Sequence, residues 1–317
     1  MIKDISKFCL GTWSLGGATK GASSYGKISE KLVEKILDLS FEKGINTFDT
    51  ASVYGKSEKL LGKFIKNKRD KIKIASKIGC TSYFKKINFE KKTILHNLEL
   101  SLRNLKTDYI DICQLYNPNP QDKKLLSAIE YLQELKKKGK IKYLGVSLQN
   151  PSDYLYLRKN FKFDMIQCNF NMLDQRLLEN KILKKMTIDK VSIFVRTVLN
   201  FGFFTESIIN KKKISFKKND HRSRWNKSQV ENWHVFSKKI ADNFDLNIED
   251  LAIRFIMSQK LINSVIIGVM NIDQLNKLTK LNNLKSLKDR DLRIINNIYK
   301  LYEKNRLLKP KIPMKSR

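Results

Sequence analysis

The chain has 317 residues, of which 41% are hydrophobic, so it can bury a substantial core and disorder is not expected. Its 63 basic and 31 acidic residues give a formal net charge of +32. Three explanations for this charge are nucleic-acid binding, a preference for anionic substrates, and a compositional bias of the whole proteome. The lysines are spread along the chain and no basic terminal arm occurs, so we expect no specific nucleic-acid partner.

In the first half of the chain, short apolar runs alternate with amphipathic helical stretches. The runs that predict strands are Ile5–Leu10, Ile45–Phe48, Ile72–Ser76 and Tyr109–Leu115. The helices that follow them are expected from the N-cap Ser29 to Gly44, from near Ser57, over Phe89–Leu105 and over Asp122–Lys138.

The second half continues the alternation. Its predicted strands are Ile141–Val146, Met165–Gln167, Val191–Val195 and Ser264–Ile267. Its predicted helices start at Pro151 and Ile272 or cover Leu177–Met186, Gln229–Phe244, Ile248–Gln259 and Leu287–Tyr302, and the segment Phe201–Lys227 is irregular. Strand-like runs each followed by a helix predict a (β/α)₈ TIM barrel with extra C-terminal helices, in one domain over residues 1–317. A doubly wound sheet would require glycines after the first strand, and the chain contains no GxGxxG motif.

The cysteines and the longest apolar runs bear on the cellular compartment. The 4 cysteines form no CxxC pair and lie in or beside apolar runs, which is typical of buried, reduced thiols rather than of a metal or redox site. No apolar run approaches the roughly 20 residues that span a bilayer. We therefore expect a cytoplasmic protein with no metal and no membrane partner.

Polar residues or glycines close nearly every predicted strand. In a (β/α)₈ barrel the site is built at these C-terminal strand ends. Asp49 follows the second strand, Tyr54 lies in the next loop, and Lys77 closes the third strand. We interpret these three residues as a proton-donating unit held against a cofactor; the alternative is a packed tyrosine beside an incidental Asp–Lys pair.

Several segments resemble the aldo-keto reductases. They are Leu10–Trp13, Gly44–Glu58, Asp108–Pro118, Gly145–Ser147, Gln167–Gln175 and Asp220–Arg224. The matches extend from the first strand to the eighth, and the Asp-Tyr-Gly segment together with Lys77 is the most specific of them. The resemblance implies a (β/α)₈ barrel that binds NAD(P)H in an extended pose and reduces a small carbonyl compound by hydride transfer.

The resemblance also implies roles for the proton-donating unit. Tyr54 would be the general acid, Lys77 would lower its pKa from about 10, and Asp49 would hold Lys77 in place and charged. The family usually adds a histidine where this chain has Tyr116. A phenol can also donate a hydrogen bond, so the alternatives are carbonyl reduction with a flatter pH profile, an altered reaction, or a cofactor-binding regulatory protein without turnover.

Matching the family residue by residue assigns a cofactor site. The expected cofactor-binding residues are Gly11, Thr12, Ser147, Gln167, Arg196, Gly268, Asn271 and Gln274. Leu148 stands where an asparagine usually contacts the nicotinamide carboxamide, and Lys277 could supply charge at the adenosine end. NADP is the cofactor that the resemblance implies, with NAD as the alternative.

The segment Phe201–Lys227 is too long for a tight turn, and long loops on this face of a barrel commonly shape the substrate site. The expected pocket residues are Trp13, Tyr25, Phe203, Phe204, His221, Arg222, Arg224 and Trp225. Apolar walls with cations favour a carbonyl substrate with anionic or hydroxyl-rich parts, such as a sugar derivative. The alternative is a surface loop with no role in substrate binding.

Overall fold

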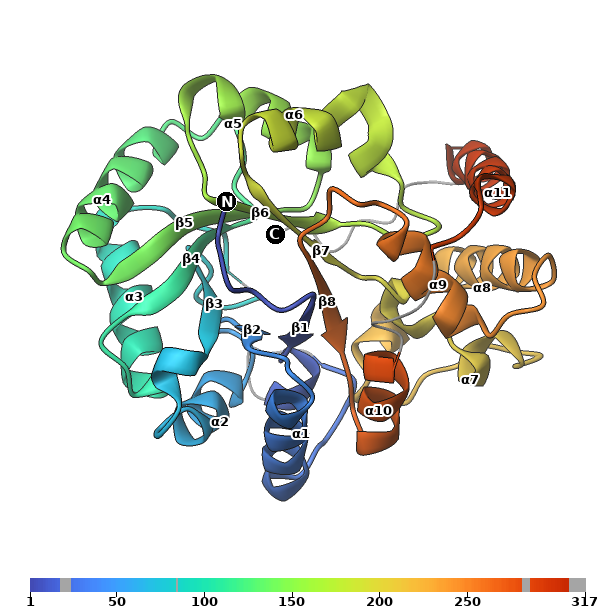
Figure 1. The fold of residues 1–317 in the computed structure, drawn as a ribbon, viewed down its shortest axis with the longest axis horizontal. Coiled ribbons are helices and arrows are strands. Elements are labelled where there is room, and N and C mark those ends of the chain that lie inside the picture. The colour runs from blue at the N-terminus through green and yellow to red at the C-terminus, as the bar shows by residue number, and fades with distance from the viewer. Residues whose placement is uncertain (18–23, 84, 281–285, 308–317) are drawn as a thin grey trace.

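The computed structural model describes residues 1–17, 24–83, 85–280 and 286–307, and its parallel strands close into a barrel in sequence order (Figure 1). The strands are β1 (Phe8–Gly11), β2 (Thr47–Asp49), β3 (Lys73–Ile78), β4 (Ile110–Tyr116), β5 (Ile141–Leu148), β6 (Met165–Asn169), β7 (Ser192–Arg196) and β8 (Ser264–Gly268). The predicted (β/α)₈ fold is therefore confirmed.

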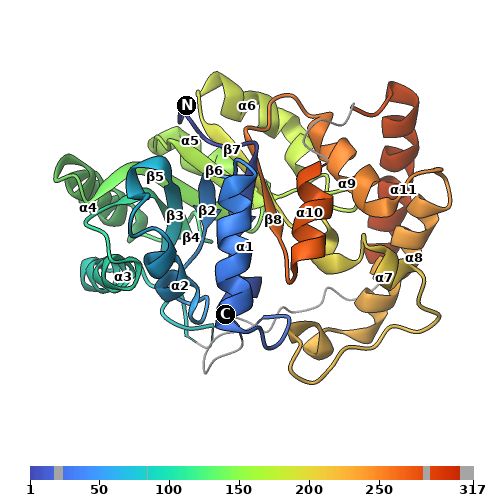
Figure 2. The same cartoon turned by 60° about the horizontal axis from the view of Figure 1, so that its bottom comes forward.

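Helices surround the barrel. They are α1 (Glu30–Glu42), α2 (Ser57–Phe64), α3 (Lys91–Leu105), α4 (Leu125–Lys137), α5 (Tyr154–Asn160), α6 (Ile182–Ile188), α7 (Glu206–Ile209), α8 (Lys227–Ala241), α9 (Ile248–Met257), α10 (Ile272–Lys280) and α11 (Asp289–Leu307). Figures 1 and 2 show α7, α8, α9 and α11 grouped on one side of the barrel, beside β7 and β8. These helices widen the rim of the barrel on that side.

Two predicted elements differ from the structure. The first strand begins at Phe8 rather than Ile5, because Ser6 donates its N–H to the Asn46 side chain and its hydroxyl to the Phe8 carbonyl before the ladder starts. The single helix expected over Leu177–Met186 is a 3₁₀ segment, Arg176–Lys181, followed by α6. Left-handed φ angles of 48° and 56° at Asn180 and Lys181 break it.

The buried hydrophobic side chains form four clusters, of which two build the barrel and its surroundings. Within the barrel a small cluster of buried side chains fills the space between the strands: Ile2, Cys9, Ala75, Ile112, Met165, Phe194 and Ile266. A much larger cluster lies between the strands and the surrounding helices and joins nearly all of them. The barrel is a packed interior rather than a pore, so a ligand can enter only at its ends.

The strand register gathers the residues that end the strands. Gly11 is the partner of both Asp49 and Gly268, because β1 lies between β2 and β8. Tyr116 pairs with Ser147 across β4 and β5, and Ser147 pairs with Gln167 on β6. Residues far apart in the sequence therefore form one ring at the C-terminal mouth of the barrel.

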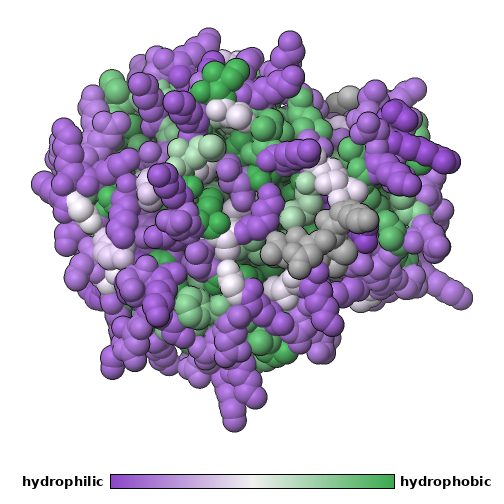
Figure 3. Space-filling model, in the orientation of Figure 1, coloured by the Kyte–Doolittle hydropathy of each residue, from purple (hydrophilic) through white to green (hydrophobic). Residues whose placement is uncertain are grey.

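The surface is mostly hydrophilic. On the face seen in Figure 3, hydrophilic side chains cover most of the area, with small apolar patches between them. Among the described residues no helix is both long enough and apolar enough to cross a membrane.

Candidate active site

Asp49 and Lys77 form a buried ion pair at the mouth of the barrel. Lys77 Nζ lies 2.6 and 2.7 Å from the two carboxylate oxygens of Asp49 and donates to the Thr50 carbonyl at 3.0 Å. The side-chain amides of Gln114 and Gln167 donate to Asp49 Oδ2 at 3.2 and 2.6 Å. Three side chains thus neutralise or satisfy this carboxylate, as a buried charge requires.

Gln114 is a member of this network that the sequence analysis missed. It lies two residues before Tyr116 on the same strand, so its side chain points to the same face of β4. The spacing of two residues between Gln114 and Tyr116 could have predicted this position from the sequence.

Tyr54 lies directly against the pair. The Lys77 ammonium lies 4.8 Å from the centroid of the Tyr54 ring, over its face, while its N–H groups are engaged with Asp49 and Thr50. The pKa of Tyr54 is raised well above its usual value, chiefly by burial of the hydroxyl and further by Tyr116 and Asp49, and Arg196 is the cation that opposes this rise. The lowering of this pKa by Lys77 stays a prediction.

Two glycines fix the loop that carries Tyr54. A Cβ at Gly16 would lie 1.7 Å from the Tyr54 carbonyl oxygen, and a Cβ at Gly55 would lie 2.3 Å from the Gly16 carbonyl oxygen. Gly55 also has φ +59°, a left-handed conformation that favours glycine. The Lys56 N–H donates to the Gly16 carbonyl at 3.0 Å, so the two segments are held in close contact.

Tyr116, at the end of β4, has a second tyrosine beside it. The pKa of Tyr83, in the segment after β3, is raised well above its usual value, chiefly by burial and next by Tyr116. Both rings pack with Tyr54 in one cluster, and all three line the same cavity. The sequence analysis missed Tyr83, because no periodic pattern marks a loop position.

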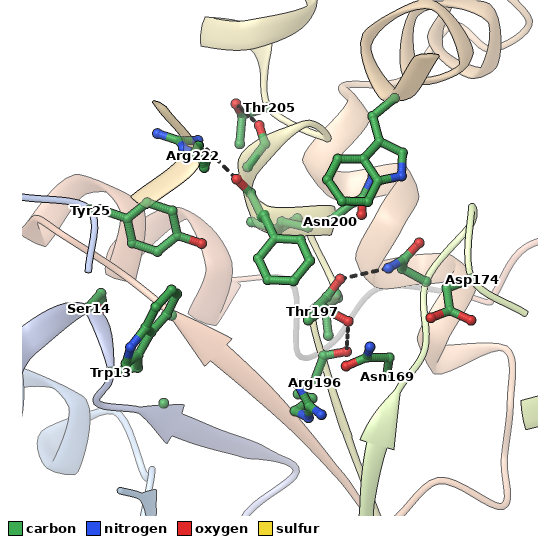
Figure 4. Close-up of a pocket in the computed structure, with 18 of the residues that line it drawn as sticks. Trp13, Ser14, Tyr25, Asn169, Asp174, Arg196, Thr197, Asn200, Thr205 and Arg222 are labelled. Atoms are coloured by element: carbon green, nitrogen blue, oxygen red, sulfur yellow. Dashed lines mark hydrogen bonds between the residues drawn. The ribbon is translucent and has the colours of Figure 1, made fainter. Parts of the chain in front are cut away.

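The cavity at the barrel mouth has a volume of about 1520 Å³, more than the roughly 300–1,000 Å³ of an ordinary small-molecule site. The predicted residues that line it are Gly11, Trp13, Tyr25, Asp49, Tyr54, Tyr116, Gln167, Arg196, His221, Arg222, Arg224, Trp225, Gly268, Gln274 and Lys277. Figure 4 shows Trp13 and Tyr25 on one side and Asn169, Arg196 and Thr197 on the other.

Two predicted cofactor residues lie behind the cavity wall. The Thr12 hydroxyl is buried, donates to the Asp49 carbonyl at 2.8 Å and accepts a hydrogen bond from Ser57. The Ser147 hydroxyl is buried and donates to Gln167 Oε1 at 3.3 Å. Both therefore support residues of the site instead of lining it.

Asn271 and Phe203 also differ from their predicted positions. The Asn271 side chain accepts from the Gln274 N–H at 2.8 Å and so caps the start of α10. Phe203 is fully buried in an apolar cluster with Ile208 and Val230, so it supports the loop and does not form a pocket wall. Phe204 is also fully buried and does not line the cavity, whereas the remaining predicted pocket aromatics, Trp13, Tyr25, His221 and Trp225, do.

An aromatic cluster forms one wall of the cavity around His221. The His221 ring centroid lies 4.7 Å from that of Trp13, 4.8 Å from that of Tyr25 and 4.9 Å from that of Trp225. Burial lowers the pKa of His221 to about 4, so the imidazole is neutral at physiological pH.

Arg222, next to this cluster, has its charge neutralised. Its guanidinium makes a two-point ion pair with the buried Asp220, with distances of 3.0 Å from Nε to Oδ1 and 2.7 Å from Nη2 to Oδ2. Its Nη1 donates to the Phe201 carbonyl at 2.9 Å, a bond visible in Figure 4. Arg222 lines the cavity, but it holds the surrounding loops together more than it offers a free cation.

Six buried polar atoms in the lining residues have no partner among the described residues. Two of them, Nε of Arg196, a donor, and Oδ1 of Asn169, an acceptor, lie on neighbouring strands in register. At the next strand a Cβ on Gly268 would meet only Ser14 Oγ, at 3.9 Å, so the strand end leaves open space. A ligand with adjacent acceptor and donor groups, such as the carboxamide of a nicotinamide, fits the Arg196 donor and the Asn169 acceptor.

The fold and the site define a (β/α)₈-barrel protein with a large polar ligand cavity at its C-terminal mouth. A model of the aldo/keto reductase family matches residues 7–300, so the chain belongs to that family. It is therefore an oxidoreductase of the class that acts on carbonyl compounds with a nicotinamide cofactor.

Individual relatives agree with this assignment. The uncharacterized oxidoreductase YqkF of Bacillus subtilis is 30% identical over 280 residues, covering 86% of this chain and 85% of that protein. The NADH-specific methylglyoxal reductase of Escherichia coli is 28% identical over 222 residues, or 64% of this chain and 67% of its own. Among solved structures, the aldo-keto reductase AKR11C1 from Bacillus halodurans, in its holo form, has a TM-score of 0.76 at 24% identity, covering 93% of this chain and 92% of its own.

Proposed function

We propose that this protein reduces the carbonyl group of an aldehyde or ketone, with Tyr54 as the general acid. The observation that carries the proposal is the position of Tyr54, which lines the ligand cavity directly against the buried Asp49–Lys77 pair and beside Tyr116. A cofactor-binding protein without turnover is the alternative. Among the described residues nothing specifically favours it, since Tyr54, Asp49 and Lys77 lie together at the cavity.

Each residue of the unit has a distinct task in this mechanism. The bound nicotinamide supplies the hydride that reaches the carbonyl carbon. Tyr54 donates its proton to the carbonyl oxygen, and as a phenol it carries that proton at neutral pH. Arg196, which opposes the rise in its pKa, favours the release of the proton. Tyr116 donates a second hydrogen bond to that oxygen, in the role that the family gives to a histidine. Asp49 holds Lys77 against the face of the Tyr54 ring, and this contact keeps the ring in position.

The cavity wall fits a hydroxyl-bearing carbonyl substrate. Of the two cations expected to attract an anion, Arg222 already shares its charge with Asp220, whereas Arg224 lines the cavity with no ion pair among the described residues and could receive an anionic group. The wall opposite Arg196 consists of aromatic rings, which provide apolar faces for the C–H side of a small sugar-like or hydroxylated substrate.

We propose NADP as the cofactor, with NAD as the alternative. Lys277 and Gln274 line the cavity beyond Gly268, where an adenosine phosphate would lie in the extended pose. Lys277 Nζ is 3.4 Å from Glu249 Oε1, so part of its charge is compensated and NAD is also compatible. The four cysteines are free and buried, which fits the reducing cytoplasm.

The test is the oxidation of NADPH and NADH by purified protein with a panel of aldehydes, hydroxyaldehydes and sugar ketones. Tyr54→Phe removes the proton donor and should lower kcat/KM by about 10³-fold or more. Tyr116→Phe removes only a hydrogen bond and should lower it by about 10-fold. Equal losses for the two variants would contradict this assignment of roles. Cofactor-induced stabilisation without turnover on any carbonyl would favour the alternative.

A further inference from the structure

The end of the cavity beyond β8 holds a buried carboxylate that the mechanism above does not use. Glu249 lines the cavity from the first turn of α9, and only 9% of the residue is exposed. Its Oε1 accepts from the Glu206 N–H at 3.4 Å and lies 3.4 Å from Lys277 Nζ, whereas Oε2 is buried without a partner among the described residues. A buried carboxylate oxygen without a donor costs free energy, so a ligand that brings a donor to this oxygen removes the cost.

Lys277 supplies the positive charge at this end of the cavity. Residues 264–280, which comprise β8, α10 and the turn between them, are all described, and those that line the cavity are Ile266, Ile267, Gly268, Met270, Gln274, Lys277 and Leu278. Lys277 is the only charged residue of this set, and 42% of its side chain is exposed. Its ammonium is therefore accessible to a ligand, but Glu249 already compensates part of its charge.

Both helices that carry this pair are fixed where they begin. Asn247 Oδ1 accepts from the Glu249 N–H at 3.1 Å and so caps α9, and the N-terminus of a helix favours a negative charge such as that of Glu249. Asn271 Oδ1 accepts from the Gln274 N–H at 2.8 Å and caps α10 in the same way. The carboxylate and the ammonium are thus part of the cavity wall, and their separation depends on the fold.

NADP and NAD differ only at the 2′-position of the adenosine ribose, which carries a phosphate in NADP and a hydroxyl in NAD. A phosphate needs cations whose charge is available, whereas a hydroxyl donates a hydrogen bond to a carboxylate. We propose that Glu249 is a specificity-determining residue: it withholds Lys277 from the 2′-phosphate and accepts a hydrogen bond from the 2′-hydroxyl, so that the site binds NADH as well as NADPH. The inference rests on the cofactor binding of the proposed function, in which the adenosine end lies beside Gln274 and Lys277.

The experiment measures the Kd values of NADPH and NADH by isothermal titration calorimetry, without a carbonyl substrate. Glu249→Gln removes the charge and keeps an acceptor oxygen in a side chain of the same shape, whereas Glu249→Ala removes both. Lys277→Met, alone and combined with Glu249→Gln, tests whether the effect depends on Lys277. Asp38→Asn is the matched control, because Asp38 on α1 forms an exposed ion pair with Lys68 at 3.1 Å and does not line the cavity.

Glu249→Gln should bind NADPH about tenfold more tightly, because Lys277 becomes available to the phosphate, and should bind NADH within about twofold of the wild type. The gain for NADPH should shrink as the ionic strength rises from about 0.05 to about 0.5 M, and it should be lost in the Lys277→Met background. Glu249→Ala should weaken NADH about tenfold, the loss expected for one hydrogen bond to a charged acceptor. Asp38→Asn should leave both Kd values unchanged.

Two different results would overturn the inference, and they are distinguishable. If the wild type binds neither dinucleotide, the proposed function fails and the role of Glu249 fails with it. If the wild type binds a dinucleotide but Glu249→Gln weakens NADPH and NADH equally, leaves the ratio of their Kd values unchanged, or gains as much in the Lys277→Met background, only the role of Glu249 fails. A wild type that binds both dinucleotides and reduces no carbonyl contradicts the proposed reaction, whereas the shift in the Kd ratio still supports the role of Glu249.

Discussion

Lowering the pH should destabilise the fold through His221. This ring is only 8% exposed and is surrounded by the rings of Trp13, Tyr25 and Trp225. Burial is the main reason that its pKa falls from 6.5 to about 4; the cations of Arg222 and Arg224 add to this shift, and Asp220 opposes it. Between these two pH values the unfolded chain binds a proton on His221 that the folded chain does not.

The sign and size of the effect follow from this difference. Because the folded pKa is the lower one, the stabilising contribution is complete above about pH 6.5 and is lost as the pH falls toward 4. One pKa unit corresponds to about 1.4 kcal/mol, so the free energy of unfolding should decrease by roughly 2 kcal/mol between pH 7 and pH 5 from His221 alone.

Urea-induced unfolding of the wild type and His221→Phe at pH 7, 6 and 5 measures this contribution. The phenylalanine keeps an aromatic ring in the cluster and cannot titrate, so the wild type should lose about 2 kcal/mol more than the variant over this range. The comparison holds even if His221→Phe is less stable at pH 7, because only the change with pH is used. If both proteins lose the same amount, the neutral, desolvated state assigned to His221 is refuted.

Further predictions concern the ion pair, the glycine contact and the cofactor. Lys77→Met leaves the Asp49 carboxylate buried with amide donors only and should cost about 3–5 kcal/mol of unfolding free energy in urea, whereas Lys56→Met, in an exposed pair, should cost at most about 1 kcal/mol. Gly16→Ala forces a methyl group into the backbone carbonyl of the proposed acid and should abolish turnover; Gly44→Ala, where the Cβ meets open space, should cost about 1–2 kcal/mol and leave kcat unchanged. NADPH at 100 times its Kd should stabilise the fold by about 2.7 kcal/mol, and no shift of the urea midpoint would contradict cofactor binding.

The barrel and much of the site were predictable from the sequence for a geometric reason. Parallel strands in register bring their C-terminal ends to one mouth, so the residue that closes each apolar run is a candidate regardless of its distance along the chain. Asp49, Gln167, Arg196 and Gly268 all reach the cavity in this way. Period-two alternation within β4 also places Gln114 on the same face as Tyr116.

What could not be predicted depends on side-chain direction and on loops. The residues at positions 49 and 77 indicated an ion pair near Tyr54, but only packing shows that Lys77 lies over the face of the Tyr54 ring. Tyr83 lies in a segment without periodicity, whose course depends on the left-handed turn at Gly79 and on Asn97. These are tertiary contacts, and no local pattern encodes them.

The balance of charge within the cavity wall indicates where a ligand is needed. Asp49 is matched by Lys77 and Asp220 by Arg222, so these ionised groups require nothing from outside the chain. Arg196 forms no ion pair among the described residues; Nη2 reaches the Leu148 carbonyl at 3.2 Å and Nε is buried without an acceptor. A buried donor of a charged group that lacks an acceptor costs free energy, and a bound molecule that supplies one removes that cost. The same guanidinium is the cation that opposes the rise in the pKa of Tyr54, so the residue that most needs a ligand also acts on the proposed acid.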